Sequence, residues 1–147
     1  MGEYAIKARF EADCPPANVM KWLDNTEGIA GWWSDRVEGE AASAGDQFHV
    51  SFPTTPVVFD LEVTAASDNT VEWHVPESPP WWKGTTIRFE LAAGESGKTD
   101  LLFTHRGFEP DDPIIDVINP AWVRFLDNLV AVAESDRPAP AVVNWAS

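Results

Sequence analysis

The feature that most constrains the fold is a stretch from residue 37 to residue 107 in which apolar and polar residues alternate. Alternation with a period of two is typical of strands that bury one face, and turn-forming residues separate the alternating runs. Most of the connections are short, as antiparallel neighbours require. The pattern predicts six strands, at 37–41, 46–52, 57–65, 70–75, 85–91 and 99–107.

A strand and two short helices are expected before this stretch. Residues 4–12 alternate in the same way, which predicts another half-buried strand. Pro15 and Pro16 end that strand and open a helix that reaches Asn25, and a second short helix is expected over 27–33. The predicted order is therefore one strand, two short helices, six strands and a final helix.

The final helix is long and amphipathic. Asn119 and Pro120 predict its start, because asparagine caps free backbone N–H groups and proline at the first helical position has none to lose. An apolar stripe with helical spacing follows, and strands succeeded by a helix indicate an α+β domain. We expect a curved antiparallel sheet of about seven strands to wrap around this helix. The stripe contains Trp122, Phe125, Leu126, Leu129 and Ala133.

Length, charge and cysteine content restrict the class of protein. A chain of 147 residues suits one domain, placed at 1–137, with a proline-containing tail at 138–147. The chain has ten Lys and Arg residues and 24 Asp and Glu residues. The resulting net charge of −14 disfavours nucleic acid and membranes as partners. The single Cys14 excludes an internal disulfide, and the lack of a leader-like or long apolar run favours a cytoplasmic protein. Neither a metal nor another cofactor is expected.

Three short motifs have simple structural interpretations. Residues from Gly94 to Thr99 read GESGKT, but a phosphate-binding loop opens a helix, whereas Thr99 opens a strand, so a hairpin turn is expected. Cys14 has no basic neighbour in sequence and is interpreted as small buried filler. Asp111 and Asp112 are interpreted as caps of a short helical turn.

The candidate binding residues are aromatic side chains that alternation places on the inner faces of the strands. Their volume exceeds what tight packing easily accommodates, so they either form a solid core or line an apolar pocket. Only one histidine shares this inner face, where a structural or ligand-orienting role is favoured over a catalytic one. The candidate pocket residues are Phe48, Phe59, Trp73, Phe89, Phe103, His105, Trp122 and Leu126.

Other aromatic and histidine residues are expected outside this set. His49 and His74 alternate onto the outer faces of their strands and are predicted to face solvent. Four tryptophans fall in loops or at helix ends, where they either close the mouth of a pocket or form a satellite cluster. These four are Trp32, Trp33, Trp81 and Trp82.

Four segments carry a resemblance to a known family. They are PANVMKWLDNTEGIAGWWSD at 16–35, WKGTTIRFEL at 82–91, LLFTHRGF at 101–108 and WVRFLDNL at 122–129. In this order they resemble the START-like, or SRPBCC, superfamily, and within it bacterial proteins similar to the C-terminal domain of the heat-shock ATPase activator. The resemblance implies a helix-grip fold with an interior cavity. Relatives include lipid carriers, hormone receptors and cyclases, so the fold does not select one function.

Three functions stay open at this point. The leading hypothesis is binding of a small hydrophobic or amphipathic ligand in a cavity between the sheet and the final helix. A protein-interaction or chaperone-cofactor module of the activator type would use the outer surface and its charge instead. A cyclase- or hydratase-like enzyme would need an inward acid/base pair, of which only His105 is visible. The protein is expected to be a monomer or a homodimer.

Overall fold

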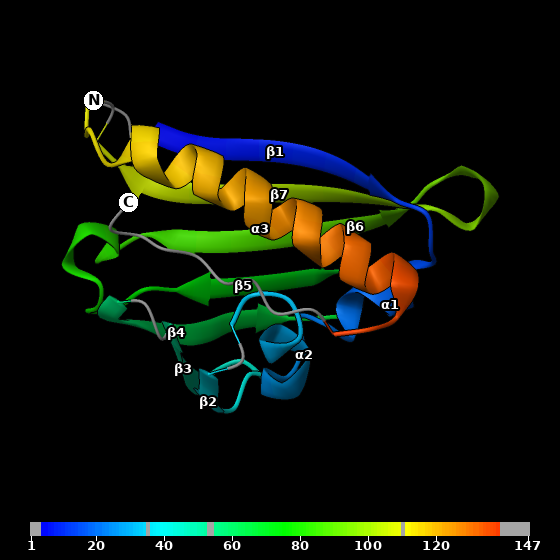
Figure 1. The fold of residues 1–147 in the computed structure, drawn as a ribbon, viewed down its shortest axis with the longest axis horizontal. Helices are drawn as coiled ribbons and strands as arrows, with labels where there is room; N and C mark the ends of the chain where they lie inside the picture. The colour runs from blue at the N-terminus through cyan, green and yellow to red at the C-terminus, as the bar shows by residue number, and fades with distance from the viewer. Residues whose placement is uncertain (1–3, 35, 53–54, 110, 139–147) are drawn as a thin grey trace.

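The computed structural model describes residues 4–34, 36–52, 55–109 and 111–138, so the predicted tail lies outside it beyond residue 138 (Figure 1). It contains one antiparallel sheet with the strand order β1-β7-β6-β5-β4-β3-β2. The strands are β1 (Tyr4–Ala12), β2 (Arg36–Gly39), β3 (Gln47–Phe52), β4 (Thr55–Ala66), β5 (Thr70–His74), β6 (Thr86–Ala93) and β7 (Thr99–Phe108). The helices are α1 (Pro16–Met20), α2 (Thr26–Ala30) and α3 (Ile115–Ser135).

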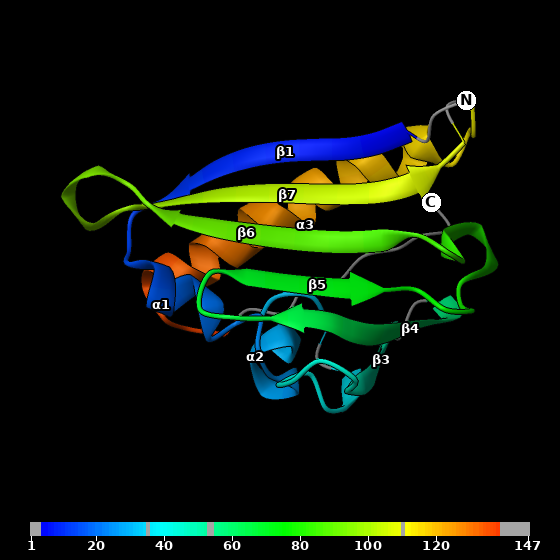
Figure 2. The same ribbon diagram turned by 180° about the vertical axis from the view of Figure 1, so that it is seen from behind.

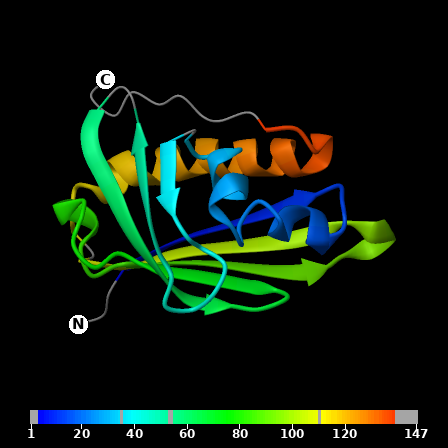
Figure 3. The ribbon, with the colours of Figure 1, turned by 90° about the horizontal axis from the view of Figure 1, so that it is seen from below.

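The predicted sheet is confirmed, with every strand within two residues of its expected bounds. The first strand, β1, pairs with the last strand, β7, and Phe10 lies opposite Leu101 in that register. Register shifts within β1, β3 and β4 mark irregularities of the kind that bend a sheet. Seen from below, the sheet curves around α3 (Figure 3). This is the helix-grip arrangement that the sequence predicts.

The short connections also follow the prediction. Strands β6 and β7 are joined by a 3-10 turn, η2 (Glu95–Gly97), and Ala93 pairs with Thr99 across it. The GESGKT segment is therefore a hairpin turn between two strands. Cys14 is buried, as expected of a small filler residue.

The final helix begins one turn earlier than predicted, at Ile115 instead of Asn119. The Asp112 carboxylate accepts a hydrogen bond from the backbone N–H of Ile114 at 3.0 Å, so Asp112 caps the short turn that leads into α3, as expected, whereas α3 itself has no side-chain cap. Ile115 and Ile118 are buried and anchor this first turn. Apolar burial thus outweighs the presence of Pro120, which lies inside the helix and lacks one backbone donor.

The two N-terminal helices are shorter than predicted because Asn25 begins the second one. Its side chain accepts a hydrogen bond from Gly28 N–H at 2.6 Å, which caps α2 and separates it from α1. A Cβ atom on Gly28 would lie 2.2 Å from the carbonyl oxygen of Lys21. Glycine at this position therefore lets α2 pack directly against the preceding backbone.

The helices leave one face of the sheet open. From behind, α3 is seen beyond the strands, which cross in front of it (Figure 2). The predicted apolar stripe of α3 is buried from Trp122 to Ala133, which confirms the side of the helix that faces the sheet. The concave face thus holds the core, and the convex face carries the polar side chains of the strands.

Candidate functional site

The eight candidate pocket residues lie together on the concave face and are at most 1% exposed. They come from five strands and from α3. Six of them form a chain of ring contacts, and Phe59 joins this chain through Trp82. Trp122 of α3 lies 4.5 Å from Phe103 of β7 between ring centroids, and Phe103 lies 5.3 Å from Phe89 of β6. We call these residues, together with the three tryptophans that join them below, the aromatic cluster.

Trp32, Trp33 and Trp82 also belong to the aromatic cluster, so the expectation of a pocket mouth or a satellite cluster was wrong for them. Each is fully buried. Trp33 stacks on Trp73 with centroids 6.0 Å apart and planes at 5°. The reason is that α2 lies on the concave side near α3, so the residues after it enter the core (Figure 3). Ile29, Trp32 and Trp33 share helical spacing, which was the available signal in the sequence.

The aromatic rings fill the space that could have been a cavity. Centroid distances within the cluster run from 4.5 Å for Phe103 and Trp122 to 6.5 Å for Trp33 and Trp82. Such distances are normal for rings in van der Waals contact. The three pockets described for the structure lie elsewhere and are lined by other residues. In this conformation the candidate residues pack mainly against one another.

His105 has both ring nitrogens engaged within the protein. The indole N–H of Trp122 donates to Nδ1 at 2.9 Å, so the proton of the neutral ring lies on Nε2, which faces Thr85 Oγ1 at 2.8 Å. The Thr85 hydroxyl in turn donates to the carbonyl of Trp82 at 2.6 Å. Burial lowers the pKa of His105 to about 3, which keeps it neutral at pH 7. These contacts favour the structural role of His105 over ligand orientation or proton transfer.

Three indole donors in the aromatic cluster have no hydrogen-bond partner among the described residues. They are the Nε1–H groups of Trp33, Trp73 and Trp82. Trp32, by contrast, donates to the carbonyl of Trp22 at 2.6 Å. Edge-on contacts with neighbouring rings supply only weak N–H/π interactions. Buried donors are normally paired, and each unpaired one costs about 1–3 kcal/mol, so these three donors would gain from any acceptor that reached them.

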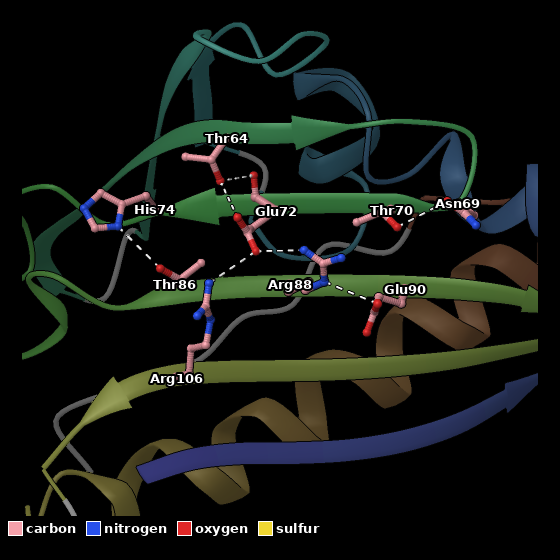
Figure 4. Close-up of polar contacts among 9 residues, drawn as sticks. All are labelled: Thr64, Asn69, Thr70, Glu72, His74, Thr86, Arg88, Glu90 and Arg106. Carbon is pink, nitrogen blue, oxygen red and sulfur yellow. Dashed lines mark hydrogen bonds and ion pairs between the residues drawn. The ribbon is translucent and has the colours of Figure 1, made fainter. Parts of the chain in front are cut away.

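The convex face presents the opposite situation, with a half-buried carboxylate that is fully partnered (Figure 4). Glu72 of β5 accepts hydrogen bonds from Arg88 at 3.0 Å and Thr64 at 3.0 Å, and Arg106 lies 3.5 Å away. Burial raises the pKa of Glu72, but the hydrogen bonds from Arg88 and Thr64 and the charge of Arg106 outweigh it and leave the pKa below its ordinary value. Glu72 is therefore a charged structural centre on this face.

A surface groove of about 400 Å³ lies beside this network. Its apolar part includes Leu91 and Leu102, and Leu102 is 42% exposed. The charges at its rim are paired, since Arg9 lies 3.3 Å from Asp100 and Glu90 lies 3.3 Å from Arg88. The groove therefore offers apolar contact but few free polar groups.

The two outer histidines behave as their alternation predicts. His49 is exposed and its Nδ1 lies 2.6 Å from the Asp60 carboxylate. His74 lies on the convex face, half-buried and near Thr86 (Figure 4). Within the described ranges, no group of three or more His, Cys, Asp and Glu side chains could hold a metal ion. No helix in this part of the chain is long and apolar enough to cross a membrane.

A seven-stranded antiparallel sheet that grips a long C-terminal helix defines the START-like class of domain. Residues 13–134 match the family described as Activator of Hsp90 ATPase homolog 1-like protein, and the chain belongs to that family. The match covers most of the chain and includes both the aromatic cluster and the convex-face network.

Solved structures support the fold. The solution structure of the Aha1 dimer from Colwellia psychrerythraea is 26% identical, with a TM-score of 0.79 over 89% of this chain and 96% of that one. A crystal structure of a Mesorhizobium loti protein is 20% identical, with a TM-score of 0.76 over 90% and 98% of the two chains. A Staphylococcus saprophyticus protein is 17% identical, with a TM-score of 0.76 over 95% and 98%. No curated protein matches the chain significantly.

Proposed function

We propose that this protein binds a small apolar or amphipathic molecule within the aromatic cluster, between the sheet and α3. The observation that carries the proposal is the set of three fully buried indole donors, on Trp33, Trp73 and Trp82, that lack an acceptor among the described residues. A bound molecule with a polar atom would supply that acceptor and exclude water from the aromatic walls.

Entry of a ligand requires some rings to move, because the cluster is packed in this conformation. Two of its segments are held by neither a strand nor a long helix. Trp82 lies on the three-residue turn η1 (Pro80–Trp82), and Trp33 follows the short helix α2. Displacement of these two side chains would open space against β5 and α3, where Trp73 and Trp122 remain fixed by their elements.

The test combines ligand discovery with a matched pair of substitutions on α3. Mass spectrometry of the protein purified under native conditions should detect a co-purifying small molecule. Leu126→Trp adds a ring inside the core, whereas Val123→Trp adds the same ring at an exposed position of the same helix. We expect an apolar environment-sensitive dye to bind the wild type and Val123→Trp, and to lose most of its affinity for Leu126→Trp.

The alternative is a permanently solid core. Overpacking by Leu126→Trp would then cost about 1–3 kcal/mol of stability. That cost, together with no dye binding and no co-purifying ligand in the wild type, would rule out the proposed pocket.

A protein-interaction role is a second candidate, supported by the family description and by the similarity to an Aha1 dimer. It would use the convex face, whose polar side chains are covered by none of the helices in the described ranges. The measurement is the ATPase rate of purified Hsp90 with and without this protein. The role would be supported if the protein stimulates the ATPase, if Arg106→Glu on the convex face abolishes this stimulation, and if Arg124→Glu on α3 retains it. An unchanged ATPase rate would count against the role.

A cyclase or hydratase role has no comparable support, because His105 is neutral and fully bonded.

A further inference from the structure

The outer side of α3, which faces away from the sheet, carries an exposed apolar pair. Val117 and Val123 are 49% and 42% exposed, and they are two of the four large apolar side chains that are exposed among the described residues. The other two, Val58 and Leu102, lie on separate strands. Figure 1 shows α3 in front of the sheet, with no described strand or helix over its outer side. The two valines therefore form an uncovered apolar patch on one helix.

Two opposite charges flank this apolar patch. Asp116 and Arg124 are both exposed, and neither forms an ion pair within the described part of the chain. Arg124 is the one basic residue in the sequence of α3, which also contains three acidic residues. This part of the helix is therefore locally neutral, although the chain carries a net charge of −14.

The four side chains are arranged symmetrically about Pro120, which is also exposed. Asp116 precedes Pro120 by four residues and Arg124 follows it by four, while Val117 and Val123 lie three residues before and after it. Residues four apart form one ridge on the surface of a helix, so Asp116, Pro120 and Arg124 lie in line with a valine on each side. The ridge thus has an apolar centre, a negative charge at one end and a positive charge at the other.

A second copy of the same helix fits this pattern. If two such ridges run antiparallel about a two-fold axis near Pro120, each Asp116 comes beside Arg124 of the partner subunit. The valines then enter the grooves next to the ridges. The commonest class of helix packing, with an interaxial angle of about 50°, aligns ridges of this kind. Because a two-fold axis makes every contact twice, the arrangement forms two ion pairs and two apolar contacts.

Other classes of partner fit this surface less well. A nucleic acid or an anionic membrane would meet Asp116 and the strongly negative chain. A basic protein surface would place like charge against Arg124, and an acidic one would place like charge against Asp116. A surface that carries both charges in the reverse order satisfies both residues, and the antiparallel copy supplies that order.

We propose that two copies of this protein associate through the outer sides of their α3 helices, antiparallel, across a two-fold axis near Pro120. The contact spans about two and a half helical turns, which is small compared with a standard interface of about 1,600 Å². Repulsion between two acidic chains weakens it further. We therefore expect a dissociation constant on the order of 100 µM. The proposal is independent of ligand binding, because the aromatic cluster lies on the opposite side of α3.

Charge substitutions at the two ends of the ridge test the pairing. Asp116→Arg and Arg124→Asp each bring like charges together at both symmetry-related contacts, and sedimentation equilibrium measures the dissociation constant of each variant. We expect each single variant to dimerise about tenfold more weakly than the wild type. The double variant Asp116→Arg/Arg124→Asp pairs opposite charges again and should return to within about threefold of the wild type.

A control separates this pairing from an effect of net charge. Asp116→Arg makes the chain less acidic, which would strengthen association through any other face. Asp68→Arg makes the same charge change in the exposed turn between β4 and β5, where Asp68 has no ion pair among the described residues. We expect Asp68→Arg to leave dimerisation unchanged or slightly stronger, so that weakening by Asp116→Arg points to a local contact.

Paramagnetic relaxation tests the orientation of the two helices. A nitroxide is attached to Asp127→Cys, which is exposed on α3, whereas the native Cys14 is buried. The labelled protein is mixed with ¹⁵N-labelled wild type, so that only effects between subunits are observed. The antiparallel contact should broaden the amide signals of residues 111–116 in the ¹⁵N-labelled subunit. A parallel contact would broaden those around Asp127 instead.

The remaining outcomes would overturn the proposal. A monomer at every concentration up to about 1 mM would leave the outer side of α3 to a different partner. Dimerisation that the single charge variants leave unchanged, or that the double variant does not restore, would show that Asp116 and Arg124 do not pair between subunits. Broadening that is remote from the start of α3 would place the contact on another face or in another orientation.

Discussion

On the concave face of the sheet, the indole donors of Trp33, Trp73 and Trp82 are fully buried and have no partner in the described part of the chain, whereas on the convex face the half-buried Glu72 has three. One face is apolar and uncharged, with unused hydrogen-bonding capacity. On the other face, the charged carboxylate of Glu72 already has its partners within the protein. The comparison indicates which face would give a ligand more binding free energy. A ligand that pairs a buried, unpaired donor gains more than a ligand that must displace a hydrogen bond already formed within the protein.

The largest expected difference between the two faces comes from adjacent residues of β7. Phe103 is fully buried in the aromatic cluster, and Leu102 is 42% exposed on the opposite face. We expect Phe103→Ala to lower the free energy of unfolding by about 3–5 kcal/mol and Leu102→Ala to change it by less than about 0.5 kcal/mol. Urea denaturation monitored by circular dichroism measures both.

The size of the Phe103 effect also sharpens the comparison. A loss well under 2 kcal/mol would mean that the cluster tolerates removal of a ring, as the walls of an opening pocket would. A comparable loss for Leu102→Ala would contradict the distinction between the faces, and would point to a covered convex surface instead.

The sequence predicted which residues share each face better than it predicted what they contact. Alternation in β7 correctly separated Phe103 from Leu102, and the helical stripe correctly placed Trp122, because both depend only on local periodicity. Trp33 was misplaced because its burial depends on how α2 packs against the rest of the fold. The start of α3 was missed because the burial of Ile115 and Ile118 depends on the tertiary fold, whereas Pro120 gives a stronger local signal.

The candidate site shows the same limit. The inward position of His105 follows from strand alternation, but its partners Thr85 and Trp122 are 20 and 17 residues away in sequence. No local pattern identifies such contacts. The unpaired indole donors are equally invisible in the sequence, since they depend on the absence of a neighbour in three dimensions.

A smaller effect is expected from titration of the concave face. Native His105, with its pKa lowered to about 3, stays neutral at pH values where the unfolded histidine, near pH 6.5, is protonated. The unfolded state therefore binds more protons as the pH falls from 6.5 towards 3, and stability is lost by up to about 1.4 kcal/mol per pH unit. Between pH 7 and 5.5 the loss from this residue should be about 1 kcal/mol.

His105→Gln removes this titration and should flatten the profile between pH 7 and 5.5. His49→Gln removes an exposed histidine that is paired with Asp60 and should leave the His105 contribution in place. Urea midpoints at the two pH values give the comparison. An unchanged pH dependence in His105→Gln would mean that solvent or a proton reaches the buried ring, which would contradict a closed core.

The smallest effect is expected on the convex face, at Glu72. Because its pKa is lowered in the native state, the carboxylate stabilises the fold above the ordinary pKa, and this contribution is lost as the pH falls through the native value. Its partners Arg88 and Arg106 are substantially exposed, which screens the interaction. Glu72→Gln should therefore lower the free energy of unfolding by only about 1 kcal/mol at neutral pH, and by less in 1 M salt.

Glu62→Gln on neighbouring β4 is the matched control. Glu62 forms no ion pair among the described residues, so this substitution should have almost no effect. A salt-independent loss of several kcal/mol at Glu72 would show that the convex face is as strongly desolvated as the aromatic cluster, and would remove the contrast between the two faces.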